Sequence, residues 1–576
     1  MKTVYKVTFL IMILIPLHGL KLLSSQDLPN DPFFEYQWNL YNDGNISDSS
    51  VAGADINILR AWKITEGSSD VVIVMFDRGI DLDSITGELH HPEMNDSDMH
   101  LLGKNFTTAW GGDTTNVRDG HPGGTGGHGT WVSGVIFAEK NNNEGIAGIA
   151  PGVKALHHRV AGGNPTESYF FRDAALDVKT NLNDSDKRYI VNYSSGWDIH
   201  PDNSSAQYDQ FKDLEEGVQH LDTAGVILVS ISHNFNRDSL TYPAKFAGSQ
   251  FDYDHVIAVG STDQKDERCV CTDPNVHDIC SSEKPRGSHY GPELTIMAPG
   301  VRIPSTDLIY AENHIYGDGS DLTGPYRKPG ICSGSMAAPH VSGVAGLILS
   351  INNQLSPGEV RAVLKQSAAK VGGVNYDGNG FHEEMGFGRL DAYQALIYTI
   401  ANHGAVLGKD KEDVQLILED DIALKEDVAI ADNTLLTIEA PDGNVTISSE
   451  SGTVTIGGQW SGGGSAKITG DDDVDGFVSP DLEEVDTRPG RFHLSQNYPN
   501  PFNPETVFRY ELPVESEVVF EVYDILGRRV AVLVNERKSA GSHQATWDAS
   551  NMASGTYIYR LQAGDFVQSR QMLLIK

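Results

Sequence analysis

The chain carries a serine in a position suited to nucleophilic chemistry. Residues 333–343 read Ser-Gly-Ser-Met-Ala-Ala-Pro-His-Val-Ser-Gly, and the apolar, small-residue run 341–349 predicts a buried helix. Ser335 then lies at the amino-terminal end of that helix, where partial positive charge favours a developing anion. A serine in that position suits attack on a carbonyl carbon. The alternative is an ordinary serine helix cap with a small-residue helix packed behind it.

A carboxylate and an imidazole stand where they could assist such a serine. Residues 71–76 form a continuous apolar run, which predicts a strand buried on both faces of a parallel sheet, and Asp77 follows directly. Functional groups in open α/β sheets lie just past the carboxyl ends of strands, so Asp77 is suited to orient a histidine. His128 stands between Gly127 and Gly129, and glycine lets neighbouring main chain approach closely.

Together these segments resemble the subtilisin-like serine proteases, or subtilases. The family's serine motif is G-T-S-M-A-A-P-H-V-S-G, from which this chain departs at Ser333 and Gly334. Its histidine motif is H-G-T-H-V-A-G, and Trp131 stands where a second histidine is usual. Arg78 replaces the small hydroxyl residue that follows the aspartate in the family. The order Asp, His, Ser along the chain is that of subtilisins, and the resemblance covers roughly residues 30–402.

The resemblance implies a fold, a reaction and a set of site residues. The implied fold is α/β, with a doubly wound and mostly parallel sheet. The implied reaction is acyl transfer: Ser335 attacks the scissile carbonyl, His128 takes and returns the proton, and Asp77 holds the imidazole. Asn234 is the implied oxyanion donor, and the strand edge that binds polypeptide substrates is assigned to Ser194, Ser195 and Gly196. No cofactor is needed for this chemistry, and structural calcium is expected at ligands that the sequence does not identify.

Three functions fit these motifs. The first, which we favour, is an active secreted endopeptidase. The second is a catalytically impaired subtilase-fold module that serves binding or adhesion. Arg78, Trp131, His233 and Gly334 favour it because each lies in a catalytic motif, and pairing of Arg78 with Asp77 would lower activity. The third is an esterase with the same triad, since the acyl chemistry is shared.

Composition and the amino-terminal residues bear on location and partners. Residues 1–25 contain Lys2 and Lys6, the apolar run 7–17 and two serines, which predicts a secretory signal peptide. That run is shorter than the ~20 residues of a membrane span, and the sequence predicts no other spanning segment. The chain has 43 basic and 79 acidic residues, a formal charge of −36 that disfavours binding to nucleic acid or anionic membranes.

Export permits disulfide bonds among the four cysteines, which are Cys269, Cys271, Cys280 and Cys332. The first three share one polar loop, which predicts a bond within that loop. Cys269 and Cys271 are too close in sequence to pair easily. Four cysteines allow three pairings, and the sequence leaves the choice open; zinc binding is the alternative to a disulfide.

Residues 403–490 follow the predicted catalytic domain, residues 26–402, and differ from it in pattern. Apolar and polar residues alternate, which predicts short strands, and residues 461–465, Ser-Gly-Gly-Gly-Ser, predict a flexible linker. Asp471, Asp473 and Asp475 have the first half of a calcium-loop spacing, but position twelve is Leu482. A solvated acidic linker is the favoured interpretation.

Residues 491–576 predict a small β-sandwich, because short strands are separated by glycine, asparagine and proline turns. The segment 497–504, Asn-Tyr-Pro-Asn-Pro-Phe-Asn-Pro, and the Gly-Thr-Tyr at 555–557 resemble the C-terminal sorting domain of type IX secretion cargo in Bacteroidetes-like bacteria. That resemblance implies export through the periplasm and outer membrane of a Gram-negative bacterium by the type IX machinery. An accessory carbohydrate- or matrix-binding domain is the alternative.

Overall fold

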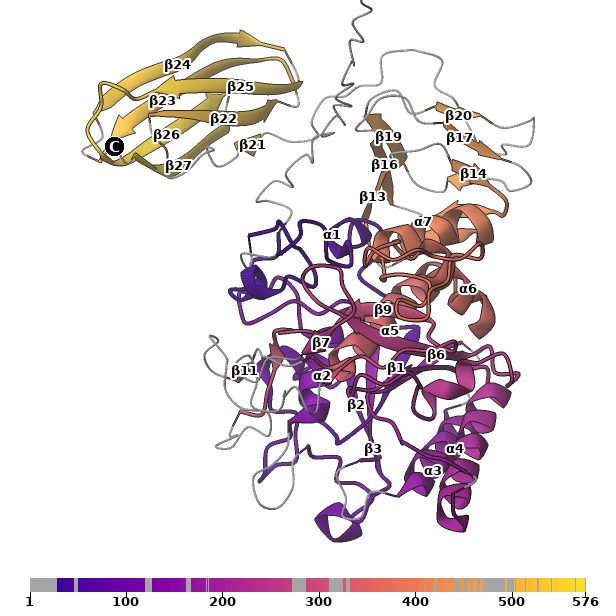
Figure 1. The fold of residues 1–576 in the computed structure, drawn as a ribbon. Coiled ribbons are helices and arrows are strands. Elements are labelled where there is room, and N and C mark those ends of the chain that lie inside the picture. The colour runs from indigo at the N-terminus through magenta and orange to yellow at the C-terminus, as the bar shows by residue number, and fades with distance from the viewer. Residues whose placement is uncertain are drawn as a thin grey trace, which may run out of the picture. The chain divides into compact units, whose positions relative to one another are not determined.

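The chain divides into two compact units, Met1–Phe477 and Val478–Lys576 (Figure 1). The computed structural model describes residues 28–574 apart from residues 46–49, 120–126, 162–166, 183, 185, 202, 272–285, 310–324, 328–331, 410, 419–421, 432–433, 440–445, 450–453, 457–458, 464–466, 470–492, 495–501, 503, 513, 526–527, 540 and 565. The predicted signal peptide, Cys280 and the acidic segment around Asp473 lie outside the described residues.

A parallel seven-stranded sheet forms the centre of the first unit, in the order β2-β3-β1-β4-β5-β6-β9. The strands are β1 (Val71–Asp77), β2 (His100–Asn105), β3 (Lys154–Arg159), β4 (Arg188–Tyr193), β5 (Ile227–Ile231), β6 (Val256–Thr262) and β9 (Ile296–Pro299). All seven residues of β1 are buried, as the continuous apolar run predicts. The expected doubly wound α/β fold is confirmed.

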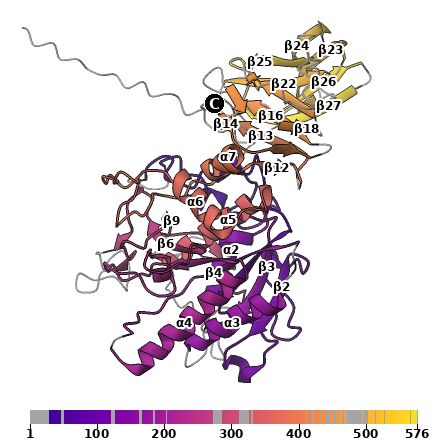
Figure 2. The ribbon, with the colours of Figure 1, turned by 90° about the vertical axis from the view of Figure 1, so that its right-hand side faces the viewer.

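The pleat of β1 divides its side chains between two hydrophobic cores. Val71, Ile73 and Met75 belong to one core, and the residues between them belong to the other. The first core holds the helices α1 (Ile58–Ala61), α2 (His128–Phe137), α5 (Gly334–Ile351), α6 (Pro357–Ser367) and α7 (Ala392–His403). The second is covered by α3 (Ser168–Asn181) and α4 (Ser205–Thr223), which run side by side in Figure 2.

The helix that carries Ser335 lies in the middle of the first core. Every residue of α5 is buried, and it extends beyond the predicted run 341–349 at both ends. Among the described residues, α5 alone has the length and apolar composition of a membrane span, and it is wholly enclosed by protein. A capping box starts α6: the Ser356 hydroxyl accepts from the main-chain N–H of Glu359, and the Glu359 carboxylate accepts from the main-chain N–H of Ser356.

Residues 405–469 form a parallel β-helix. Its three sheets have the orders β12-β15-β18, β13-β16-β19 and β14-β17-β20, so each turn of the chain adds one strand to each sheet. The strands are β12 (Ala405–Leu407), β13 (Asp413–Ile417), β14 (Ile422–Leu424), β15 (Val428–Ile430), β16 (Leu435–Glu439), β17 (Thr446–Ser449), β18 (Val454–Ile456), β19 (Gln459–Gly463) and β20 (Lys467–Thr469).

The β-helix packs directly on the α/β core. Leu407 and Leu416 belong to the same hydrophobic cluster as α5 and α7. The Tyr393 hydroxyl donates a hydrogen bond to the Ile417 carbonyl oxygen at 2.6 Å. The prediction of a flexible linker was wrong for residues 461–463, because they pair with β16 as part of β19.

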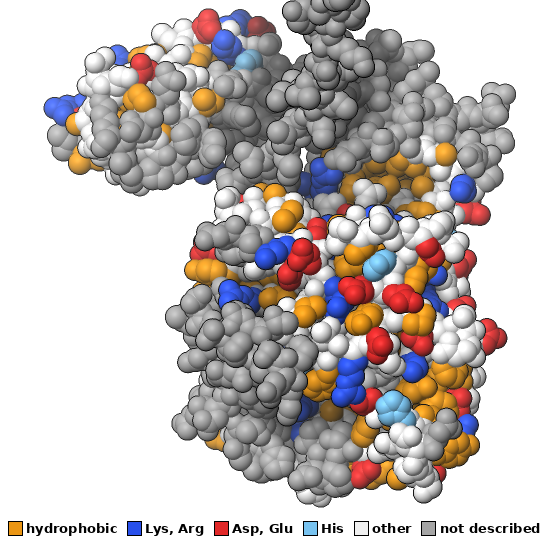
Figure 3. All heavy atoms as spheres, viewed as in Figure 1, with side chains coloured by type: hydrophobic (Ala, Val, Ile, Leu, Met, Phe, Trp, Pro, Cys, Tyr) orange, Lys and Arg blue, Asp and Glu red, His pale blue; other side chains and the backbone are white. Residues whose placement is uncertain are grey.

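The second unit is a β-sandwich of two antiparallel sheets, with orders β21-β22-β25 and β24-β23-β26-β27. Phe508, Phe520 and Tyr559 pack together between them. The strands are β21 (His493–Leu494), β22 (Glu505–Leu512), β23 (Ser516–Asp524), β24 (Arg529–Lys538), β25 (Gly541–Asp548), β26 (Gly555–Ala563) and β27 (Phe566–Leu574). On the face of the second unit that Figure 3 shows, the described surface carries both acidic and basic side chains.

Candidate active site

The predicted site residues follow three adjacent strands of the central sheet. Asp77 ends β1, Ser194 follows β4 and Asn234 lies three residues beyond β5. These strands are parallel and neighbouring, so their carboxyl ends meet at one edge of the sheet. Such an edge is where α/β proteins place their functional groups.

Asp77 and His128 form a buried pair. The Nδ1 atom of His128 lies 2.7 Å from Oδ1 of Asp77, and both side chains are less than a tenth exposed. Because a carboxylate oxygen only accepts, Nδ1 donates the proton and Nε2 is left as the basic nitrogen. The main-chain N–H of Arg78 donates to the same carboxylate oxygen at 2.8 Å. Arg78 therefore contacts Asp77 through its main-chain N–H. Within the part of the chain that the structure describes, no ion pair joins the two side chains.

Two glycines allow the Asp77 turn and the start of α2 to approach each other. A Cβ atom at Gly129 would lie 2.1 Å from the main-chain oxygen of Gly79, so only glycine fits there. Gly79 has a φ of +104°, which glycine adopts readily. The first turn of α2 is capped by Asp119, whose Oδ2 accepts from the N–H and the hydroxyl of Thr130 at 2.7 and 2.9 Å.

Ser335 is the second residue of α5, after the N-cap Ser333. Its main-chain N–H belongs to the first helical turn, which has no intrahelical acceptor and favours negative charge. Its hydroxyl donates to the main-chain oxygen of Ser194 at 3.2 Å, and the Ser194 hydroxyl donates to the Ser335 carbonyl at 3.0 Å. The structure therefore joins Ser335 to the β4 edge, and the described residues show no hydrogen bond between Ser335 and His128.

Asn234 faces the amino-terminal end of the same helix. Its Oδ1 accepts the main-chain N–H of Gly334 at 2.6 Å. Since Oδ1 is engaged in this way, the Nδ2 group is the end of the amide that can donate to a developing oxyanion.

The segment that follows β4 has the backbone character of a binding edge. Trp197 pairs with Tyr242 through two main-chain bonds of 2.8 and 3.0 Å. Just before it, Ser195 and Gly196 make no main-chain hydrogen bond with any described residue. Their N–H and C=O groups can pair with an extended peptide, which is how strand addition works.

Arg159 is a buried residue that sequence reasoning missed. It ends β3 beside Asp77, and its Nη1 donates to the main-chain oxygens of Arg78 and, at 2.6 Å, of Arg118. It thereby ties the turn after Asp77 to the residue before Asp119, which caps the helix of His128. An arginine inside a buried strand, in Leu-His-His-Arg-Val, is the signal that could have found it.

A disulfide bond joins Cys269 to Cys332, three residues before Ser335. Cys269 therefore takes no part in the bond predicted within its own loop, because the tertiary structure brings it beside a cysteine 63 residues away. Cys271 is disulfide-bonded as well. These bonds leave no free thiolate among the described cysteines for zinc.

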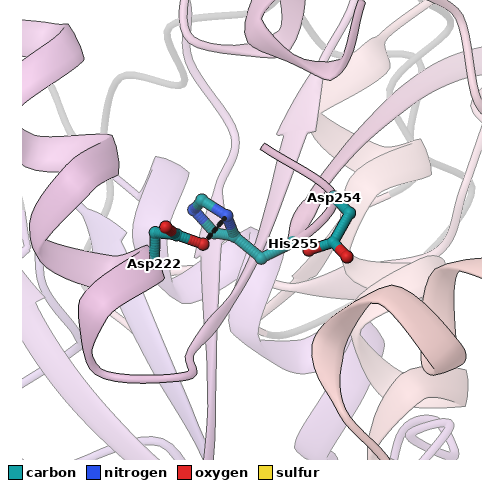
Figure 4. Close-up of side chains that lie close together, drawn as sticks. All are labelled: Asp222, Asp254 and His255. Atoms are coloured by element: carbon teal, nitrogen blue, oxygen red, sulfur yellow. Dashed lines mark ion pairs between the residues drawn. The ribbon is translucent and has the colours of Figure 1, made fainter. Parts of the chain in front are cut away.

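One cluster of metal-ligand types occurs among the described residues: Asp222, Asp254 and His255 (Figure 4). Asp254 and His255 directly precede β6 and Asp222 lies in the last turn of α4, so the cluster is at the edge of the sheet opposite to Asp77. His255 is buried, its Nδ1 lies 3.0 Å from Asp222 Oδ1, and burial lowers its pKa to about 4. The short Asp222–His255 contact requires no metal ion, and the calcium expected from the resemblance stays a prediction.

Comparison with known proteins identifies the families of two parts of the chain. Residues 68–388 match the subtilase family, and residues 496–576 match the secretion system C-terminal sorting domain. The chain is 28% identical over 381 residues to a thermophilic serine proteinase of Bacillus sp. (strain AK1), covering 66% of this chain and 71% of that protein. It is 28% identical over 370 residues to thermitase of Thermoactinomyces vulgaris, covering 64% of this chain and 99% of that protein. It is 30% identical over 256 residues to subtilisin Savinase of Lederbergia lenta, covering 44% of this chain and 74% of that protein.

Among solved structures, a protease of Pseudoalteromonas arctica superposes with a TM-score of 0.45 and 22% identity, covering 64% of this chain and 98% of that one. The subtilase match spans more than half of the 576 residues. The chain therefore belongs to the subtilase family of serine proteases and carries a secretion system C-terminal sorting domain.

Proposed function

We propose that this subtilase is a secreted endopeptidase that hydrolyses peptide bonds through an acyl-enzyme on Ser335. The observation that carries the proposal is the buried Asp77–His128 pair at the sheet edge from which Ser194 and Asn234 contact the first turn of α5. A base oriented by a carboxylate, a hydroxyl at a helix amino terminus and a free amide donor are the parts that acyl transfer requires.

Each step uses one of these groups. The Ser335 hydroxyl turns from Ser194 to His128 and attacks the carbonyl carbon, while its proton passes to Nε2 of His128. The oxyanion that forms accepts from Nδ2 of Asn234 and from the N–H of Ser335. His128 then returns the proton to the departing amine as the C–N bond breaks. Water then gives a proton to Nε2 of His128 and attacks the acyl carbon. As the ester C–O bond breaks, His128 returns that proton to the Ser335 oxygen, and the carboxylic acid is released.

Asp77 holds Nδ1 of His128 throughout and stabilises the imidazolium ion that forms in each half-reaction. The substrate main chain pairs with residues 194–196 by strand addition. The C-terminal sandwich serves export, because its family is a secretion sorting domain. We infer that its partner is the type IX machinery and that the route passes through the periplasm and outer membrane.

The test is covalent labelling by a fluorophosphonate, which reacts with activated serines. The protein without residues 1–25 should be labelled, and Ser335→Ala should not. Ser333→Ala is the matched control, since the Ser333 side chain makes no capping hydrogen bond, and it should keep its label. Absence of label in folded, calcium-supplied protein would refute the proposal and favour the catalytically impaired binding module.

A further inference from the structure

His233, the residue before Asn234, has a backbone conformation that suits glycine. Its φ is +107°, in the left-handed region. Its ring stacks on the ring of Phe235, with centroids 4.7 Å apart, and lies 5.5 Å from the ring of His289. On another side, a Cβ atom at Gly196 would lie 3.4 Å from Cδ2 of His233. The imidazole therefore stacks on Phe235 and lies close to Gly196.

This position borders the reacting bond. Ser335 contacts Ser194 on one side, and the residue before it contacts Asn234 on the other. In a bound peptide, the side chain of the residue that supplies the attacked carbonyl starts within two bonds of the carbonyl carbon. That side chain therefore starts close to segments 194–196 and 233–235, and the His233 ring lies beside Gly196.

The ring offers a hydrogen-bond donor to that side chain. The main-chain N–H of Asn234 donates to Nδ1 of His233 at 2.8 Å, so the proton of the neutral ring is on Nε2. Burial lowers the pKa of His233 to about 4, which keeps the ring neutral at pH 7. No described residue accepts a hydrogen bond from Nε2, and the atom is not fully enclosed.

The surroundings of the ring carry positive charge in a chain whose net charge is −36. The Arg286 guanidinium lies 5.2 Å from the centroid of Phe235, and that of Arg237 lies 5.9 Å from it. Asp198 forms an ion pair with Arg237. Of the described charged residues named here, Arg237 is neutralised by Asp198 and Arg286 carries the remaining positive charge. That positive charge favours an anionic ligand.

We propose that His233 is a specificity-determining residue, and that the site selects peptides with an acidic side chain, glutamate above all, on the amino-terminal side of the cleaved bond. This inference rests on the proposed endopeptidase function. The Nε2–H group of His233 and the Arg286 guanidinium together recognise the carboxylate, while the ring fills space that a bulky apolar side chain would need.

The experiment compares three peptides that differ only at this residue: glutamate, glutamine and phenylalanine. The kcat/KM for the glutamate peptide should exceed those of the other two by about tenfold or more, as expected for a hydrogen bond to a charged group. His233→Gly places glycine at a position whose backbone conformation suits it. In this variant the ratio of kcat/KM for the glutamate peptide to that for the phenylalanine peptide should fall below about threefold. Arg286→Gln should lower the glutamate-to-glutamine ratio. Arg172→Gln removes a positive charge on α3 and is the matched control; its ratios should equal those of the unmodified enzyme.

Fluorophosphonate labelling of the same samples separates the two ways of failing. If the enzyme is labelled but cleaves phenylalanine and glutamate peptides equally fast, the specificity inference is overturned and the proposed function stands. The same holds if His233→Gly leaves every ratio unchanged. If Ser335 is not labelled, the proposed function is overturned, and the inference with it.

Discussion

Glu93 is a buried carboxyl group whose ionisation should make stability depend on pH. It is 2% exposed, and burial raises its pKa from 4.5 to about 7. Its Oε1 accepts from the N–H of Ile146 and the hydroxyl of Tyr326, and its Oε2 accepts from Nδ2 of Asn142, each at 3.0 Å. These bonds lower the pKa by less than burial raises it.

The sign follows from proton linkage. Below pH 4.5 the carboxyl is protonated in both the folded and the unfolded chain, and it imposes no cost. As pH rises toward 7, the unfolded chain loses the proton while the folded chain keeps it, so the free energy of unfolding falls. With pKa values of 4.5 and about 7, the loss between pH 5 and pH 8 is about 2.5 kcal/mol.

Glu93→Gln keeps the size of the side chain and removes its titration. Relative to the parent protein, the variant should therefore gain about 2.5 kcal/mol in free energy of unfolding between pH 5 and pH 8. Urea denaturation at several pH values, followed by tryptophan fluorescence, measures this difference. Both proteins should carry Ser335→Ala to prevent self-digestion.

Glu88→Gln is the matched control, because Glu88 is an exposed carboxylate nearby. Its difference from the parent should stay constant over the same pH range. If Glu93→Gln also differs from the parent by a constant amount, burial does not hold the proton on Glu93 and the reasoning is refuted.

Three further predictions concern the site. Gly129→Ala should reduce peptide hydrolysis at least about a hundredfold and lower Tm, because its Cβ would lie 2.1 Å from the Gly79 oxygen; unchanged kinetics would contradict that close approach. Asn234→Ala should lower kcat by about 10²–10³ with little change in KM, and an equal rise in KM would contradict an oxyanion role. Replacing Cys269 and Cys332 together by serine should lower the free energy of unfolding by about 4 kcal/mol, because the disulfide bond closes a loop of 63 residues. Urea denaturation measures this loss, and a loss under about 1 kcal/mol would contradict the prediction.

Much of the fold could be predicted because its signals are local. The all-apolar run of β1 indicates a strand buried on both faces, and the small-residue run behind Ser335 indicates a buried helix. The alternation after residue 403 predicted strands, but not the β-helix. Each of its sheets pairs one turn of the chain with the next. Ala405 pairs with Val428 and Val428 with Val454, which are separations of 23 and 26 residues that alternation does not specify.

The sequence by itself predicted which groups could react and in what order they occur: Asp77, His128 and Ser335, with Asn234 as donor. Their residue types and local motifs contain that information. Only the tertiary structure decided that Gly79 meets Gly129, that Arg159 ties the Asp77 turn to the cap of α2, and that Cys269 bonds to Cys332. It also placed the His233 ring against Gly196. These contacts join residues far apart in sequence, and they arise from the packing of parallel strands whose carboxyl ends share one edge.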